Sequence, residues 1–128
     1  MCHAHGRRDP AGLRQVHDAL VRHDLDAVMS MFAANAVLHD PVDGPVREGL
    51  GAIREFFGGG INGVRACRLA CPVHISADCR HAAVSAYSEV ELGEGISIIE
   101  TTDVLISDDD GKVSTMTAYW GPTNVRPA

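Results

Sequence analysis

The hydrophobic pattern changes once along the chain, near residue 64, and this change limits the folds available to it. Before this point, apolar residues recur three and four positions apart, as they do on one face of a helix. After it, apolar and polar residues alternate, as in strands that bury one face. Helices followed by strands predict an α+β domain, in which the helices pack on one face of a mainly antiparallel sheet.

The first half predicts three helices. We expect Asp9 to cap the first and Asp24 the second, because an aspartate side chain accepts hydrogen bonds from free amides of a helical first turn. Residues 50–57 form the third helix, which the glycines at 58–60 are expected to stop. The apolar stripes of the three helices are Leu13, Val16 and Leu20, then Leu25, Val28 and Phe32, then Ile53, Phe56 and Phe57.

A short strand is predicted over residues 36–39, directly before Asp40 and Pro41. Proline disfavours the helical region for the residue that precedes it, so Asp40 is expected to be extended at a strand end. The next segment, residues 42–49, is interpreted as a turn. A carboxylate held in such a place is suited to act as a base, although Asp-Pro is also a common way to start a turn.

The second half predicts an antiparallel meander of four strands. They span residues 64–77, with a bend near Pro72, and residues 81–92, 96–107 and 113–120. Glycine-rich and acidic joints at 93–95 and 108–111 are typical of hairpin turns. We expect the sheet to curve around the helices. The concave face of such a sheet is a common place for a ligand.

Length and composition indicate one globular domain. The chain has 128 residues, a length that suits a flexible segment at 1–8 and one domain over 9–125. Its formal net charge of -6 argues against nucleic-acid binding. No run approaches the roughly 20 apolar residues of a membrane helix, so a cytoplasmic protein without a membrane partner is expected. Four cysteines without a secretion signal predict reduced thiols.

Asp103 is the residue with the most informative position. Alternation along its strand puts the carboxyl group on the same face as Ile99, Thr101 and Leu105. If that face is buried, the group should take up a proton and become a neutral hydrogen-bond donor. The alternatives are an exposed strand position or a salt bridge to an arginine. Together, Asp40 and Asp103 have the character of a base and an acid kept apart by their environments.

Several runs resemble the bacterial ketosteroid isomerases, steroid delta-isomerases of the nuclear transport factor two-like or SnoaL-like superfamily. The resemblance extends from about Leu13 to Val125 with nearly collinear spacing. The placement of Asp40, Asp103 and Trp120 together is its most specific part. The matching runs are 23–28, 31–33, 36–42, 52–57, 103–104, 111–113, 116 and 118–121.

The resemblance implies a cone-shaped fold, usually dimeric, with a deep apolar pocket and no cofactor. It implies that Asp40 moves a proton between two carbons of a β,γ-unsaturated ketone, that Asp103 stays protonated and donates to the dienolate oxygen, and that Trp120 packs on a flat steroid. A cytoplasmic homodimer acting on an apolar small molecule is therefore expected. The remaining residues expected to contact the substrate are Val16, Phe32, Phe57, Ala86, Ser88, Ile99, Thr101 and Ala118.

The chain departs from this family at three tyrosine positions. The principal phenolic donor of the family is replaced by Val16, and its two supporting tyrosines by Phe32 and Phe57. Loss of one such donor costs roughly 100- to 1,000-fold in rate. Ser88, Thr101 or a water molecule could take its place, although either hydroxyl could equally be bonded to its own backbone.

Two other functions remain open at this level. The first is epoxide opening or cyclisation in a polyketide or terpenoid pathway, which relatives with a similar Tyr119-Trp120-Gly121 run perform. The second is a non-catalytic ligand-binding module. No functional metal is expected, because Cys67 and Cys71 in one strand would lie about 13 Å apart, too far to share a zinc ion.

Overall fold

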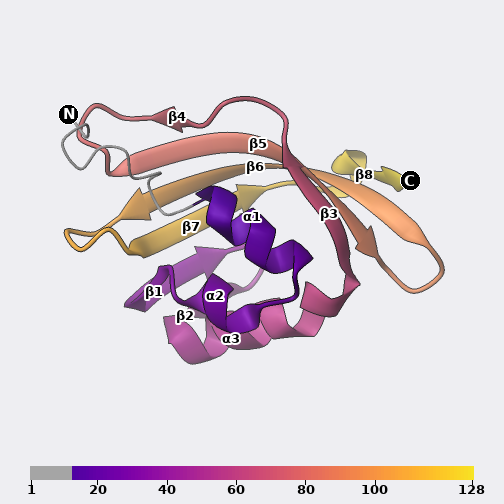
Figure 1. Cartoon of the computed structure of the whole chain (residues 1–128), viewed down its shortest axis with the longest axis horizontal. Coiled ribbons are helices and arrows are strands. Elements are labelled where there is room, and N and C mark those ends of the chain that lie inside the picture. Colours follow the sequence, from indigo (N-terminus) through magenta and orange to yellow (C-terminus); the bar gives the residue numbers. More distant parts are fainter. Residues whose placement is uncertain (1–12) are drawn as a thin grey trace.

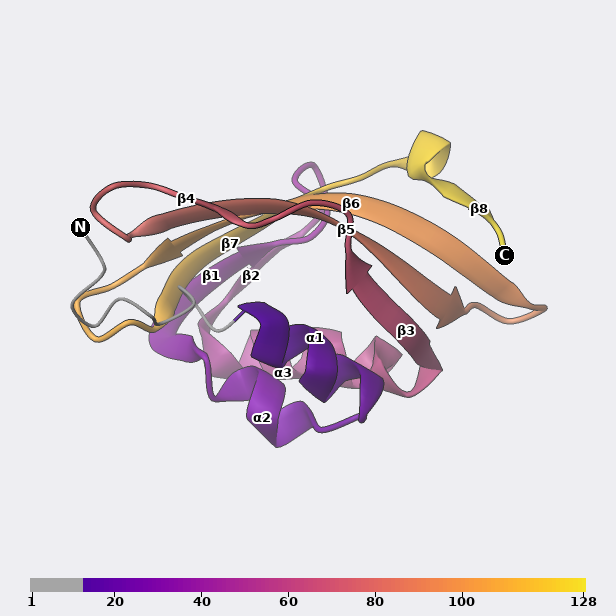
Figure 2. The ribbon, with the colours of Figure 1, turned by 45° about the horizontal axis from the view of Figure 1, so that its top comes forward.

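Three helices pack beneath a curved sheet in the computed structural model, which describes residues 13–128 (Figure 1). The sheet bends over the helices, so its inner face is concave (Figure 2). Within the described residues the helices are α1 (Leu13–Val21), α2 (Leu25–Met29) and α3 (Gly49–Gly60), with short 3-10 turns η2 (Ile61–Gly63) and η3 (Pro122–Asn124). The strands are β1 (Phe32–His39), β2 (Val46–Glu48), β3 (Val64–Leu69), β4 (His74–Ile75), β5 (His81–Glu91), β6 (Ile96–Ser107), β7 (Val113–Tyr119) and β8 (Val125–Pro127).

The second helix begins where its capping residue predicts. The side chain of Asp24 accepts a hydrogen bond of 3.1 Å from the Ala27 amide, which satisfies one of the free donors of the first turn. The predicted cap of the first helix, Asp9, lies outside the described residues, as does the segment 1–8.

The prediction that glycines stop the third helix is wrong. The helix α3 continues to Gly60. Ile53 of α3 and Ile61, which begins η2 directly after the helix, are both buried on the face that packs against the core. Burial of this face outweighs the cost of about 1 kcal/mol that each glycine imposes relative to alanine.

The predicted meander is confirmed and extended by further strands. The sheet has the order β2-β1-β7-β6-β5-β3, with β4 on β5 and β8 on β6. Successive pairs from β3 through β5 and β6 to β7 are antiparallel, whereas β1 and β7 are parallel. The prediction of a simple turn over 42–49 is wrong, because this segment contains β2. A three-residue edge strand is too short to show alternation.

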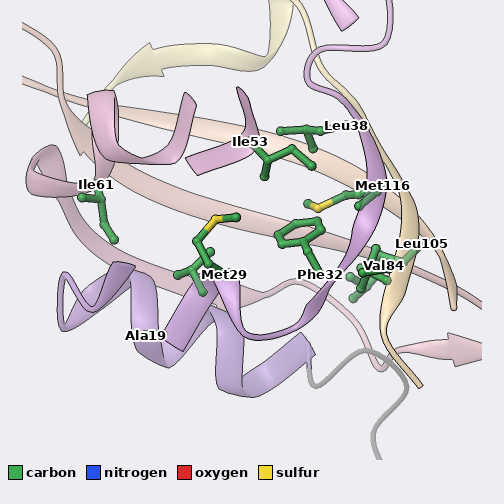
Figure 3. Packing of buried hydrophobic residues seen from close by; sticks show 13 residues of the cluster. Ala19, Met29, Phe32, Leu38, Ile53, Ile61, Val84, Leu105 and Met116 are labelled. Atoms are coloured by element: carbon green, nitrogen blue, oxygen red, sulfur yellow. The ribbon is translucent and has the colours of Figure 1, made fainter. Parts of the chain in front are cut away.

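A single hydrophobic core joins the helices to the inner face of the sheet. Leu38 of β1, Ile53 of α3 and Leu105 of β6 are almost completely buried, and they lie with Phe32 and Met116 in one cluster (Figure 3). Buried residues alternate with less buried ones over the first half of β5 and the second half of β6. The alternation therefore defines which side chains reach the concave face.

The cysteines differ from one another in the structure. Cys67 and Cys71 are free thiols, whereas Cys79 is disulfide-bonded. The expectation of reduced thiols is therefore wrong for Cys79, since the spacing of cysteines along a chain does not show which of them meet. No helix among the described residues is long and apolar enough to cross a membrane.

Candidate active site

Three adjacent strands bring Asp40 and Asp103 to the same level of the inner face. His39, the last residue of β1, pairs with Thr117 of β7, so Asp40 comes level with Ala118. Ala118 in turn pairs with Asp103 of β6. Because neighbouring strands are about 4.8 Å apart, the backbones of the two aspartates are separated by roughly 10 Å.

Asp40 is held at the strand end by the tryptophan that directly follows the neighbouring strand β7. The indole Nε1 of Trp120 donates a hydrogen bond of 2.7 Å to Oδ1 of Asp40. The segment after Asp40 is anchored as well, since the Val42 amide donates to the Ala118 carbonyl over 2.8 Å. Partial burial raises the pKa of Asp40, while the Trp120 hydrogen bond and the charge of Arg47 lower it.

Asp103 lies in the middle of the sheet and is only 6% exposed. Its Oδ1 atom is buried and accepts no hydrogen bond. Burial and the negative charge of Asp40 raise the pKa of Asp103 to about 7, against the opposing effect of a hydrogen bond from the Thr101 side chain. The structure thus places the carboxyl on the buried face, and no salt bridge among residues 13–128 involves it.

The two environments decide which aspartate keeps a proton. Asp40 has an indole donor and a nearby guanidinium, and both favour its ionised form. Asp103 is more deeply buried and faces the charge of Asp40. The first proton taken up by this pair therefore resides on Asp103, which leaves a carboxylate and a carboxylic acid on one face.

The remaining sheet residues expected from the sequence lie beside Asp103 and further along the same strands. Ala86 and Ala118 are buried beside Asp103, and Ser88, Ile99 and Thr101 are part-buried further along the strands. Ala86 pairs with Thr101 and Ser88 with Ile99 across β5 and β6. Alternation puts these side chains on the inner face with Asp103.

The positions of the missing phenols are filled by apolar side chains. Val16 is buried on α1. The rings of Phe32 and Phe57 lie 5.9 Å apart, and Phe32 belongs to the hydrophobic core cluster (Figure 3). None of the three can donate a hydrogen bond to a ligand oxygen.

Sequence reasoning did not identify two further polar residues of the site, Arg47 near Asp40 and Cys67 beside Ser88. Arg47 of β2 influences the pKa of Asp40 and lies over the Phe56 ring, 4.9 Å from its centroid. Cys67 of β3 pairs with Ser88 of β5. Arg47 comes near Asp40 through the pairing of β2 with β1, and Cys67 meets Ser88 through the pairing of β3 with β5. No local pattern reveals either pairing. No three His, Cys, Asp or Glu side chains within residues 13–128 come together as a metal site.

The raised pKa of Asp103 predicts that folding stability falls as pH rises. The folded protein holds this proton up to about pH 7, whereas the unfolded chain loses it near 3.8. The destabilisation grows between these values and reaches its full size, on the order of 4 kcal/mol, above them. Urea unfolding should therefore find Asp103→Asn more stable than the natural protein near pH 8, by a margin that shrinks near pH 5. An unchanged margin would contradict the raised pKa.

Comparison with known proteins identifies the family. A family model described as a SnoaL-like domain matches residues 13–116. The chain belongs to the SnoaL-like family. This SnoaL-like protein is 30% identical over 112 residues to a steroid delta-isomerase of Nocardioides simplex, covering 88% of this chain and 89% of that protein.

Two solved structures confirm the nuclear transport factor two-like fold of the SnoaL-like protein. The first is SalBIII, described as an epoxide hydrolase/cyclase-like enzyme with a role in pyran ring formation in the polyether salinomycin. It has a TM-score of 0.86 and 26% identity, and both chains are fully covered. The second, RV0760c from Mycobacterium tuberculosis, has a TM-score of 0.83 and 18% identity, with 94% of this chain and 98% of that chain covered. The known relatives thus include an isomerase and a cyclase-like enzyme.

Proposed function

We propose that this SnoaL-like protein is a cofactor-independent isomerase, which moves a β,γ carbon–carbon double bond into conjugation with a ketone on a steroid or steroid-like molecule. The observation that carries the proposal is the pair of carboxyl groups on the concave face, of which Asp103 is the more deeply buried and has a pKa raised to about 7. Support comes from the relative of 30% identity that is a steroid delta-isomerase.

In the proposed mechanism Asp40 transfers one proton between two carbons. Its carboxylate removes the proton from the carbon between the ketone and the double bond, and the electron pair moves onto the ketone oxygen to form a dienolate. The protonated Asp103 donates a hydrogen bond to that oxygen as negative charge develops. Asp40 then returns the proton to the γ carbon, which leaves the conjugated enone and the original carboxylate.

Trp120 has two tasks in this proposal. Its indole N–H holds one oxygen of Asp40, so the other oxygen remains free to take the substrate proton. Its ring, beside Ala118 on the inner face, presents an apolar surface to the flat hydrocarbon. Without a phenolic donor at Val16, Asp103 carries the stabilisation of the oxygen largely alone, and a modest rate is expected.

The direct test is incubation with a β,γ-unsaturated ketosteroid. We expect the ultraviolet absorbance of the conjugated enone to appear with the natural protein and to be absent with Asp40→Ala. A natural protein no faster than that variant would reject the isomerase proposal.

The pH dependence of the rate supplies a second prediction. The rate should rise as Asp40 ionises, above the usual pKa of an aspartate because burial raises it, and should fall as Asp103 loses its proton near pH 7. Because these pKa values are those of the protein without substrate, a bell-shaped profile of kcat/KM against pH is expected. The falling limb should disappear in Asp103→Asn, because an amide cannot ionise; a falling limb that persists would assign it to another group.

Epoxide opening or cyclisation is the second candidate. It is favoured by the likeness to SalBIII over the whole chain and by the apolar residues at the three phenol positions. In this reaction Asp103 would protonate the epoxide oxygen while Asp40 activates the attacking hydroxyl. Mass spectrometry would detect turnover of an epoxide, and absorbance would detect turnover of the ketosteroid. A protein that converts the epoxide and leaves the ketosteroid unchanged would favour this alternative. Binding without turnover of either would select a ligand-binding module.

We further propose that the protein is a cytoplasmic homodimer with an apolar small molecule as its ligand and without a nucleic-acid or membrane partner. The family resemblance supports the dimer, and the net charge of -6 disfavours contact with phosphate backbones. Light scattering coupled to size-exclusion chromatography gives the mass in solution and would show whether the chain is paired.

A further inference from the structure

A second polar group lies on the inner face, beyond Asp103. Ser88 of β5 and Cys67 of β3 are direct partners across the two strands, and their Oγ and Sγ atoms are 3.5 Å apart. Both side chains are part-buried. Two positions along β3, Leu69 packs against the hydrophobic core, so alternation puts Cys67 on the same concave face.

The strand register sets the distance between this pair and the aspartates. Val84 of β5 pairs with Asp103, and Ser88 lies four residues further along the same strand. Four residues of a strand span roughly 13 Å. The small Ala86 lies between them and pairs with Thr101. The inner face therefore has hydrogen-bonding groups at Asp103 and Thr101 and again at Ser88, with the small side chain of Ala86 between them on β5.

The Ser88 hydroxyl is poorly satisfied within the protein. Its one side-chain partner is a thiol, which is both a weak donor and a weak acceptor. Burial raises the pKa of Cys67, the hydrogen bond with Ser88 lowers it, and the negative charge of Asp103 raises it. The net pKa is raised, so the sulfur keeps its hydrogen. Either atom can be the donor in this contact, and because a thiol is weak in both roles, the serine O–H can turn to a better acceptor, such as a ligand oxygen.

We propose that Ser88, supported by Cys67, binds a second oxygen of the ligand at the end remote from Asp103. The proposal rests on the proposed function, because it places the reacting oxygen at Asp103, whose buried Oδ1 has no partner in the protein. It names the ligand class more closely: a rigid, flat hydrocarbon with an oxygen function at each end. A hydrocarbon with one reactive oxygen would use only half of these groups.

The test compares two ketosteroids that differ only in a second ketone on the ring farthest from the first. Trp120 is the only tryptophan of the chain and contacts Asp40, so quenching of its fluorescence measures Kd for both. We expect the natural protein to bind the diketone about 3- to 10-fold more tightly, as one neutral hydrogen bond allows. Ser88→Ala should bind both equally, and Ser88→Thr should restore the preference.

Ser85→Ala is the matched control. Ser85 lies three residues away on the opposite face of β5, where its hydroxyl bonds Thr102 over 2.8 Å, so this variant should keep the preference. If Ser88→Ala raises Kd equally for both steroids, Ser88 has a structural role and the proposal is overturned. A preference for the diketone that survives this change, or a natural protein that binds neither steroid, would also overturn it. Preferential binding without enone formation would instead reject the isomerase function and leave this inference standing.

Discussion

Replacement of Asp40 by asparagine is expected to slow isomerisation by roughly 1,000- to 10,000-fold, the upper range for loss of a general base. The amide retains the shape of the carboxyl group, and its oxygen can still accept the Trp120 hydrogen bond that holds Asp40 now. It cannot take a proton from carbon at neutral pH. The effect should therefore appear in kcat, with little change in the affinity for the conjugated product.

Asp43→Asn provides the comparison for this variant. Asp43 lies three residues after Asp40 and is exposed. Its change to asparagine removes one negative charge, as the change of Asp40 does. Its rate should stay within a few-fold of the natural one. Initial rates of enone formation measure both variants, and an Asp40→Asn protein that keeps a tenth of the natural activity would show that another group is the base.

Asp103→Leu is expected to lower kcat by about 100- to 1,000-fold, as does the loss of one donor from an oxyanion site. Leucine has the same number and branching of side-chain heavy atoms as aspartate and removes a buried polar group, but its methyl groups need more space, so circular dichroism must first show that the fold of this variant is unchanged. Asp103→Asn should lose less activity than Asp103→Leu, because its amide N–H can still donate to the developing negative oxygen. Steady-state kinetics of the two variants at about pH 6 separate these contributions.

Two outcomes would contradict the role of Asp103. Equal activities of the leucine and asparagine variants would show that the hydrogen bond itself does not matter. A loss confined to KM would show that the residue binds the ground state rather than the dienolate. Ser107→Ala serves as the control, because Ser107 is also buried on β6 but lies four residues from Asp103.

Local patterns were sufficient for much of the architecture. Alternation predicted β6 with the ends that it has, Ile96–Ser107, because a strand with one buried face imposes a period of two on its own residues. Asp24 marked the start of α2, because capping involves atoms within one helical turn. Where a segment was short or depended on distant partners, as with β2 or the glycine end of α3, the same reasoning was wrong.

The candidate site divides along the same line. That Asp103 would share a face with Leu105, and that Asp40 would end a strand, followed from the sequence itself, because both are properties of a single strand. The tertiary structure alone decided that the two carboxyls lie level across β1, β7 and β6, that Trp120 and Arg47 favour the ionised Asp40, and that Cys67 meets Ser88. The physical reason is that a pKa depends on burial and on nearby charges, and both are set by which strands pair.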